Sequence, residues 1–352
     1  MTRQYSRRTV LGVVAGVAGM AAAAPLLRPA GAIDAPAVVS GETMGTTYRV
    51  TIPLHPTGVG VGTITRELRQ VLARIDTAMS TYRAESEVSG FNRAPVDEWF
   101  PVSPDTAKVA SAAITMARIT GGAYDPTIGP LVGLWGFGPA GPSLRLPDAA
   151  DIVAARGSVG HSAFEVRPAP AALRKRHESL SVDFSGIAEG FAVDEMVNVL
   201  DRLGVPDFLV ELGGELRCRG RSPTRQPWTI AVETPSVTPA QSRWHVALPD
   251  AAIATSGDYR KFFIVDGRRY GHVIDPRTGR PVDHGLASVT VIGGSAMQCD
   301  ALATALLVMG PEAGCAFAER HRIASLFIAR GEGGFGERMT ASFGRYLREQ
   351  SA

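Results

Sequence analysis

An aspartate and a threonine one helical turn apart are the first residues whose types and spacing could do chemistry. Asp300 and Thr304 lie in the apolar segment 296–309. On a helix, positions i and i+4 share one face, and carboxylate and hydroxyl oxygens are hard ligands that suit Mg²⁺. An acid on an apolar helix is unfavourable unless it is paired or bound to metal. Taken alone, the segment is explained more simply by Asp300 facing the helix macrodipole and Thr304 bonding its own backbone.

Two further acids flank a small-residue turn in the segment 181–194. Asp183 precedes the turn at Ser185 and Gly186, and Glu189 follows it. Helix N-termini after such turns bind phosphate. Two carboxylates oppose a bare phosphate but fit a metal-bound phosphate or a ribose. Ordinary capping of a strand-to-helix connection explains the pattern about equally well.

A histidine and two tyrosines occur beside predicted turns. His272 precedes an Asp-Pro turn, so it is a candidate general base or ring contact. Tyr82 and Tyr124 lie beside flexible turns and suit stacking on a flat ligand. Each of the three is explained more simply by structure or packing when taken singly. The sequence contains no G-x-G-x-x-G, Walker A or G-x-S-x-G motif.

Among the elements predicted to position these residues, strands outnumber helices. Several strands are consecutive, which favours an α+β fold of mixed sheets with packed helices over a doubly wound sheet. Segment 126–142 is predicted to be a structured loop, and 145–176 an excursion between two lobes. Hydrophobic periodicity predicts helices over 63–79, 103–120, 148–155, 186–203, 296–309 and 311–321. Strands are predicted over 46–52, 179–184, 208–212, 215–219, 228–232, 245–248, 253–256, 288–292 and 324–329, with a hairpin of 262–265 and 270–274.

The first 32 residues have the pattern of an export signal. The segment Ser6–Leu11 resembles a twin-arginine signal, and an apolar stretch and an Ala-x-Ala site follow it. The stretch is shorter than the roughly 20 residues that a membrane span needs, so we expect cleavage after Ala32; a retained anchor is the alternative. Residues 33–352 are expected to form the functional domain, in an extracytoplasmic or periplasmic location.

Composition narrows the class of protein. The chain has 352 residues, 45% of them hydrophobic and 20% charged, so it can bury a core and is not a disordered tail. Its formal charge of +2 gives no electrostatic case for nucleic-acid binding. Residues 1–32 hold four arginines and no acid, so their removal changes the charge from +2 to −2. Three cysteines without C-x-x-C spacing indicate buried thiols, not a disulfide framework or a zinc site.

The candidate segments, taken together and in order, resemble the ApbE-type FAD:protein FMN transferase family. The resemblance runs from about residue 40 to 310. It is carried by Glu42–Tyr48, Met79–Arg83, Ser86–Asn92, Gly122–Leu131, Leu134–Gly138, Val182–Asp194, Gly213–Gly214, Thr255–Tyr259, His272–Pro281 and Asp300–Gly310.

The resemblance implies a fold, a reaction and a set of site residues. It implies mixed sheets and packed helices in a T-fold-like arrangement of two lobes around an FAD cleft. The family transfers the FMN part of FAD to a threonine hydroxyl of a target protein in a Ser-Gly-Ala-Thr-like motif, using Mg²⁺ and releasing AMP. By motif position, FAD would be lined by Met44, Tyr82, Ala123, Tyr124, Asp125, Asp183, Glu189 and His272. Mg²⁺ would be held by Asp300, Thr304 and the carbonyl groups of Gly186 and Ala303.

Within this resemblance, His272 and Asp300 are the candidate catalytic residues. The family often has lysine at the position of Glu189 and serine or threonine at that of Gly186. Two other functions remain open: an FAD pyrophosphatase that releases FMN and AMP, and a periplasmic FAD-binding protein without turnover. Nucleic acid is not an expected partner, and membrane association is expected only through the targets.

Overall fold

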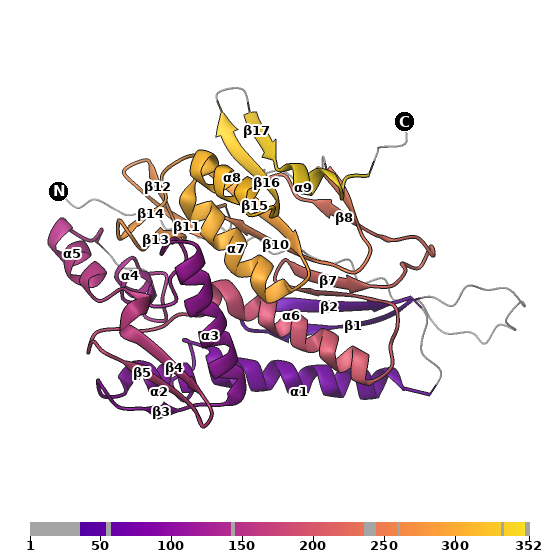
Figure 1. Ribbon diagram of the computed structural model, residues 1–352, viewed down its shortest axis with the longest axis horizontal. Helices are drawn as coiled ribbons and strands as arrows, with labels where there is room; N and C mark the ends of the chain where they lie inside the picture. Colours follow the sequence, from indigo (N-terminus) through magenta and orange to yellow (C-terminus); the bar gives the residue numbers. More distant parts are fainter. Residues whose placement is uncertain are drawn as a thin grey trace, which may run out of the picture. The chain divides into compact units, whose positions relative to one another are not determined.

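The computed structural model describes residues 36–53, 58–141, 145–235, 244–259, 261–331 and 334–348. The predicted signal, residues 1–32, lies outside the described residues. Residues Ala35–Ala352 belong to one compact unit, whose helices and sheets are mixed along the chain (Figure 1). This arrangement confirms the α+β prediction. Among the residues that the structure describes, no helix combines the length and apolar character needed to cross a membrane.

An eight-stranded antiparallel sheet forms the centre of the unit. Its strand order is β1-β2-β6-β7-β10-β15-β16-β17. Its two eight-residue strands, Leu286–Gly293 and Ala324–Gly331, are mostly buried, and the first is rich in β-branched residues, as a strand covered on both faces requires. The strands are β1 (Ala37–Thr43), β2 (Thr46–Ile52), β6 (Phe208–Leu212), β7 (Glu215–Arg219), β10 (Ala252–Gly257), β15 (Leu286–Gly293), β16 (Ala324–Gly331) and β17 (Gly334–Met339).

Helices pack on one face of this sheet and enclose the larger hydrophobic core (Figure 1). The buried residues of the first helix, among them Ile64, Leu68 and Ile75, recur at the period of a helix with one apolar face. The helix Ala296–Met309 is apolar on nearly every side because it lies between the sheet and other helices. These helices are α1 (Val61–Met79), α6 (Ser185–Arg202), α7 (Ala296–Met309) and α8 (Pro311–Arg320).

Asp194 joins α6 to the beginning of α7. Its carboxylate accepts hydrogen bonds from Ser295 Oγ at 2.7 Å and from the backbone N–H groups of Ala296 and Met297 at 3.0 and 3.1 Å. Arg217 on β7 pairs with the same carboxylate at 2.5 Å. An acid at a helix N-terminus satisfies free N–H groups and complements the macrodipole, so Asp194 fixes the position of α7.

Smaller elements cover the other face and one end of the sheet. A second core around Trp228, Leu248 and Phe343 lies under β8 (Trp228–Val232), β9 (Trp244–Leu248) and α9 (Ala341–Gly344). The first half of the chain adds α2 (Glu87–Arg93), α3 (Pro104–Ile119), α4 (Gly129–Leu134), α5 (Ala149–Gly157), η1 (His161–Ala163) and the sheet β3 (Phe100–Pro101), β5 (Ala171–Lys175) and β4 (Phe164–Pro168). Two short pairs complete the fold: β11 (Phe262–Val265) with β12 (Arg268–Gly271), and β13 (Ile274–Asp275) with β14 (Arg280–Pro281).

The predicted strand over 179–184 is wrong. Only Ser181 makes an isolated bridge, to Ile128. The side chain of Asn92 takes the place of a neighbouring strand: its Oδ1 accepts from Val182 N at 2.8 Å and its Nδ2 donates to Val182 O at 3.0 Å. Apart from that bridge, the segment joins no sheet of the described residues, and it buries the alternating side chains of Leu180, Val182 and Phe184.

Other boundaries also differ from the predictions. Segment 126–142 contains α4 rather than only a loop, and 145–176 contains α5 and the β4–β5 hairpin. Strands β1 and β17 and helix α2 were not predicted, while the hairpin around Asp266 and Gly267 is confirmed. The three cysteines, Cys218, Cys299 and Cys315, are buried free thiols as expected.

Candidate functional site

Asp300 lies on α7 and is almost completely buried, with 5% of its surface exposed. Its Oδ2 accepts a 3.1 Å hydrogen bond from the backbone N–H of Gly190 on α6. Burial, and secondarily the charge of Glu189, raise the pKa of the Asp300 carboxyl well above its ordinary value, while the Gly190 N–H lowers it. A buried carboxylate with one hydrogen bond needs a further positive partner, which is what a bound cation provides.

Thr304 lies one turn further along α7 and points to the end of β10. Its Oγ1 is 3.0 Å from Ser256 Oγ. A Cβ added at Gly186 would lie 3.1 Å from the same Oγ1 and 3.5 Å from the ring of Tyr124. Gly186 therefore brings its backbone against Thr304 in a space that has little room for a side chain.

Gly186 departs from helical geometry inside α6, with φ −89° and ψ 24°. Such a break frees backbone groups from the regular i to i−4 pattern. Ala303, the other predicted carbonyl ligand, is fully buried on α7 between Asp300 and Thr304.

The donor set of these residues suits a hard cation. No group of three or more histidine, cysteine, aspartate or glutamate side chains within the described ranges could hold a metal ion. A cation at this point would therefore depend on one carboxylate, a hydroxyl, backbone carbonyls and oxygens from substrate or water. That set fits Mg²⁺, which usually takes one or two carboxylates together with phosphate oxygens.

Glu189 and Glu215 bring two more carboxyl groups to the same place. Glu215, at the start of β7, is buried; its burial, and then the charges of Asp300 and Glu189, raise its pKa well above the ordinary value. Gly213 has φ +67°, and a Cβ there would collide with the Glu189 carboxylate. The Gly-Gly turn thus permits the close approach of Glu189 to the sheet.

Met44 lies in the β1–β2 turn beside this glycine turn. The N–H of Gly213 donates to Thr47 O at 3.1 Å, which holds the two turns together. Met44 adopts φ +50° and its side chain packs partly against the main core. The structure therefore places Met44 near the predicted site, on a separate element.

Tyr124 is buried, and its hydroxyl has no hydrogen-bond partner among the residues that the structure describes. Burial, followed by the charges of Asp300, Asp183 and Asp125, raises its pKa well above 10.0. A buried phenol without a partner is costly, and its ring adjoins Gly186. The neighbouring Ala123 is also buried, after the left-handed turn at Gly121 and Gly122.

Asp125 is occupied by contacts within the protein. Its Oδ1 accepts from the N–H and hydroxyl of Thr127 at 2.9 and 2.6 Å. Its Oδ2 lies 3.0 Å from both the backbone N and Nδ1 of His161. The geometry makes Asp125 a support for the loop that presents Tyr124, and a direct contact with FAD stays a prediction.

Tyr82 and Asp183 lie together at the open side of the site. The Tyr82 side chain is 67% exposed, and its hydroxyl donates to Phe137 O at 3.1 Å. Partial burial and the charge of Asp183 raise the Tyr82 pKa. Asp183 Oδ1 accepts from Ser185 N at 2.8 Å and from Ser185 Oγ at 2.5 Å, which fixes the start of α6. An exposed ring held at one end is suited to stacking on a planar ligand.

His272 follows β12 and is joined to this side through Phe137, whose ring meets the imidazole edge-to-face at 6.3 Å. Within the described ranges, its hydrogen bonds are both to Lys261 O. The backbone N of His272 donates to this oxygen at 3.1 Å, and Nδ1 lies 3.1 Å from it. Burial lowers the pKa of His272 below 6.5, so the ring is neutral at pH 7. If Nδ1 carries the proton donated to Lys261 O, Nε2 is left as the basic nitrogen.

The predicted residues therefore fall into three groups. Asp300, Thr304, Gly186, Ala303 and Glu189 lie on the facing helices α6 and α7, with Tyr124 against Gly186. Phe137 connects Tyr82 and His272 along an outer side, and the charge of Asp183 acts on Tyr82 there. Met44, Ala123 and Asp125 lie on supporting elements. Sequence reasoning missed the roles of Gly190, Ser256 and Glu215. The resembling segments contain Gly190 and Ser256, whereas Glu215 only follows the Gly213–Gly214 segment.

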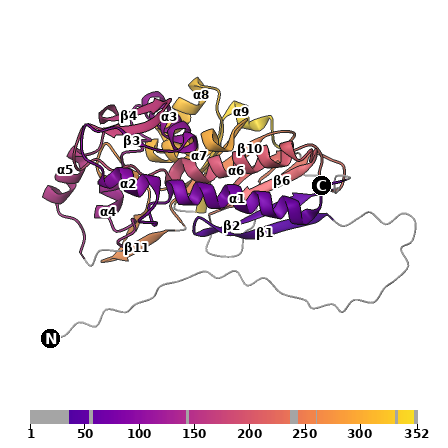
Figure 2. The same cartoon turned by 90° about the horizontal axis from the view of Figure 1, so that it is seen from below.

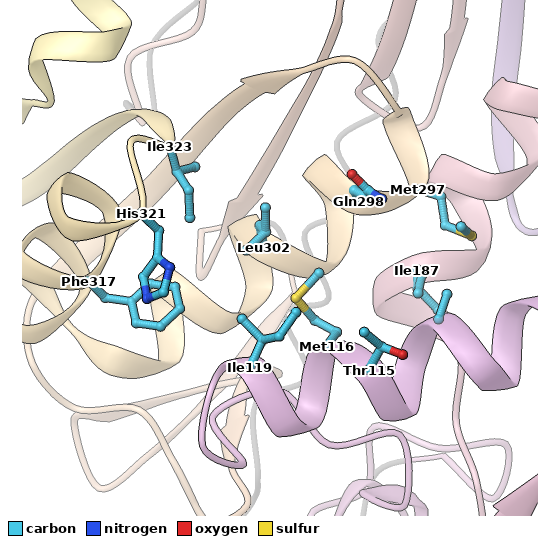
Figure 3. Close-up of a pocket in the computed structure, with 11 residues that line it drawn as sticks. Thr115, Met116, Ile119, Ile187, Met297, Gln298, Leu302, Phe317, His321 and Ile323 are labelled. Atoms are coloured by element: carbon cyan, nitrogen blue, oxygen red, sulfur yellow. The ribbon is translucent and has the colours of Figure 1, made fainter.

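An apolar cavity of about 300 Å³ lies elsewhere, among α3, α7 and α8 (Figure 3). Met116, Leu302 and Phe317 line it, and none of the predicted site residues does. Leu302 thus faces a different side of α7 from Asp300 and Thr304, so this cavity is separate from the oxygen-donor site.

Comparisons with known proteins by family model, by sequence and by structure all lead to the same protein family. The model of the ApbE family matches residues 44–327. An FAD:protein FMN transferase of Vibrio cholerae is 42% identical over 311 residues, covering 88% of this chain and 92% of that protein. One of Haemophilus influenzae is 36% identical over 316 residues, covering 87% and 90%. The solved structure of the flavin transferase ApbE from Vibrio cholerae has a TM-score of 0.83 at 40% identity, covering 89% of this chain and 99% of that one.

Proposed function

This chain belongs to the ApbE family, and from this premise we propose that it is an enzyme that transfers FMN from FAD to a hydroxyl group of a target protein. The observation that carries the proposal is the packing of α6 against α7. Asp300, Thr304 and the kinked backbone at Gly186 form an oxygen-rich site between them. Beside it lies Tyr124, whose hydroxyl has no hydrogen-bond partner in the described part of the chain.

We propose that this site holds Mg²⁺ through the Asp300 carboxylate, the Thr304 hydroxyl and the carbonyl groups of Gly186 and Ala303. Bound Mg²⁺ would neutralise charge on the pyrophosphate and on the departing AMP. The Gly190 N–H holds Asp300 in place, and Ser256 Oγ holds the Thr304 hydroxyl. These contacts position the site before the substrate arrives, so less reorganisation is needed during the reaction.

FAD is proposed to bind with its flat ring system toward Tyr82 and its phosphates toward α6 and α7. The exposed Tyr82 ring, tied to Phe137, offers a surface for stacking. Glu189 and Asp183 suit ribose hydroxyls or metal-bound phosphate rather than bare phosphate. Because the chain without its signal would carry a charge of −2, attraction of FAD depends on local donors and the cation, not on a basic surface.

His272 is proposed as the base that accepts the proton of the attacking hydroxyl. The hydroxyl oxygen forms a bond to the FMN-side phosphorus, the bond from that phosphorus to the AMP oxygen breaks, and the proton moves to Nε2 of His272. The products are the flavinylated protein and AMP. A neutral imidazole at pH 7 is in the correct state for this role.

The acceptor is proposed to be a threonine in a Ser-Gly-Ala-Thr-like motif of an exported flavoprotein or electron-transfer subunit. Export of this chain by residues 1–32 accords with such a partner. Replacing Arg7 and Arg8 by lysine should keep the protein in the cytoplasm as the uncleaved precursor. Mass spectrometry of the exported wild-type chain should find a mature N-terminus at Ile33.

Incubation of the protein with FAD, Mg²⁺ and a candidate acceptor tests the activity. In-gel flavin fluorescence on the acceptor, lost when its threonine is changed to valine, is the expected result. AMP and free FMN without labelled acceptor would instead establish a pyrophosphatase. FAD binding without AMP would establish a binding protein.

A further inference from the structure

The β11–β12 hairpin stands apart from the central sheet, as a two-stranded sheet of its own. Figure 2 shows β11 projecting on the side of α4. No strand of the described residues pairs with the outer edge of β11. Open edges are where proteins accept an added strand from another chain.

The two faces of the hairpin differ in character. Phe263 and Tyr270 face inward and stack on Phe137 and Trp135, with ring centroids 5.3 and 5.7 Å apart. Phe262 and Ile264, which alternate with them along β11, are 43% and 62% exposed. The inner face therefore anchors the hairpin. On the outer face Ile264 is uncovered, while the Arg269 guanidinium lies 3.9 Å from the centroid of the partly exposed Phe262 ring.

The hydrogen-bond register determines which backbone groups point outward. Lys261 and His272 face each other one position beyond the last pair of the ladder, Phe262–Gly271. His272 N donates to Lys261 O, so Lys261–His272 is a hydrogen-bonded pair. In an antiparallel ladder such pairs alternate with non-bonded ones. The pairs Phe262–Gly271 and Ile264–Arg269 are thus non-bonded. The N–H and C=O groups of Phe262 and Ile264 consequently point away from β12, at the same residues whose apolar side chains are exposed.

The hairpin is coupled to the proposed site at its base. Arg269 donates to Asp258 O at 2.5 Å, and Asp258 also forms a two-pronged pair with Arg330 at 2.8 and 2.6 Å. Asp258 lies two residues after Ser256, the partner of Thr304. His272 lies at the same end, opposite Lys261. A chain that runs along the outer edge of β11 and past Phe262 therefore leaves the hairpin at the end that carries His272, with Lys261 between them.

Charge indicates the kind of segment that would fit. Residues 261–271 contain three cations, Lys261, Arg268 and Arg269, and one acid, Asp266. Arg268 pairs with Asp283, and Arg269 lies 3.9 Å from the Asp258 carboxylate, so the surplus positive charge beside β11 comes from Lys261. An extended segment with an apolar residue and acidic neighbours is complementary to such an edge.

We propose that the outer edge of β11 binds the flavin-acceptor protein, whose acceptor segment adds as a strand beside Phe262–Val265 and continues to His272. This inference rests on the proposed function, because it requires a protein substrate. The backbone groups of Phe262 and Ile264 supply the added ladder, and their side chains supply an apolar contact. Acceptors are thereby selected by an extended, mildly acidic segment beside the reactive hydroxyl.

Hydrogen exchange of the backbone amides tests the added strand on the unaltered enzyme. The enzyme is loaded with FAD, without Mg²⁺, and mixed with acceptor protein whose threonine is changed to valine. Exchange at Phe262 and Ile264 should slow at least tenfold, while Phe263 and Val265 are already protected by β12. Unchanged exchange at Phe262 and Ile264 under saturating acceptor overturns the proposal. The proposal is also overturned if exchange at these two amides slows as the enzyme concentration rises in the absence of acceptor. That result would identify a second copy of the enzyme as the occupant of the edge.

Steady-state kinetics of acceptor labelling provide a second test of the proposal. Ile264→Pro removes an outward N–H and leaves the hairpin's own ladder intact, so KM for the acceptor should rise at least tenfold with FAD affinity unchanged. The matched control Ile264→Thr keeps that N–H and should raise KM less than threefold. Wild-type kinetics in Ile264→Pro overturn this proposal alone. A wild-type enzyme that releases AMP but labels no acceptor overturns the proposed function as well.

Discussion

The backbone N–H of Gly190 donates a 3.1 Å hydrogen bond to Oδ2 of Asp300 across the α6–α7 interface. These residues are 110 positions apart in the chain. Asp194 fixes the beginning of α7 one turn of α6 away. The position of the candidate metal ligand thus depends on how closely two helices approach.

Asp300→Asn removes the negative charge of the proposed metal ligand while keeping the shape of the side chain. Without metal, we expect the variant to be at least as stable as the wild type, because a buried carboxylate that resists ionisation is replaced by a neutral amide. Mg²⁺ with FAD should raise the Tm of the wild type but not that of the variant. AMP release should fall at least 100-fold, a loss of about 3 kcal/mol of transition-state stabilisation. Equal Mg²⁺-dependent stabilisation of both proteins would remove Asp300 from the metal site.

Gly190→Ala should force the helices apart. A Cβ at Gly190 would collide with the carbonyl oxygen of Ala296 and lie 2.8 Å from Met297 Cα, and neither backbone atom can move freely. We expect a loss of about 1–3 kcal/mol in the free energy of unfolding, measured by urea denaturation. The control Gly62→Ala on α1 meets nothing within 4 Å and should stabilise by about 0.5–1 kcal/mol, from helix propensity alone. Equal stability of the two variants would contradict the close packing.

Tyr124→Phe separates ligand binding from stability. Its hydroxyl is buried without a partner among the described residues, so removal should leave the free energy of unfolding unchanged or raise it by about 1 kcal/mol. If the hydroxyl finds its partner in FAD, the Kd for FAD, measured by fluorescence quenching, should rise about tenfold, or about 1.4 kcal/mol. Tyr48→Phe is a matched control, because that buried hydroxyl also lacks a partner in the described chain but is not among the predicted site residues. An identical effect of both variants on FAD affinity would refute the ligand contact.

The pH profile of transfer should have an acid limb below pH 6.5. Burial lowers the His272 pKa; the charges of Lys261 and Arg269 lower it further, while the Lys261 carbonyl and Asp258 raise it. A base acts in its deprotonated form, so activity is full above the lowered pKa and falls as pH drops through it. His272→Gln should reduce kcat by a factor of roughly 100 or more and abolish this limb, with Kd for FAD little changed. A limb that persists in His272→Gln would assign the titration to another group.

Local patterns predicted much of the fold because they depend on neighbouring residues. The apolar spacing of Ile64, Leu68 and Ile75 predicts α1. The helix predicted from residue 103 begins there, and Ser103 caps α3 by accepting a hydrogen bond from Thr106 N. The turn of Asp266 and Gly267 has the two positive φ values, 50° and 76°, that a two-residue hairpin loop favours.

Contacts between distant segments could not be predicted in the same way. Asn92 supplies both hydrogen bonds of Val182, and no local pattern in 179–184 shows that a side chain replaces the neighbouring strand. Ser256 meets Thr304 only because β10 pairs with β15 and packs under α7. The spacing of Asp300 and Thr304 gave one face of the site, whereas the partners on that face depend on tertiary packing.

The central claim is that the phosphoryl group leaves AMP for a protein hydroxyl, and the stoichiometry of products tests it most directly. FAD, Mg²⁺, enzyme and a purified acceptor are incubated while AMP is measured by chromatography and the acceptor mass by intact mass spectrometry. We expect one FMN added to the acceptor for each AMP released, and neither product with Asp300→Asn. AMP matched by free FMN, with an acceptor of unchanged mass, would contradict the account.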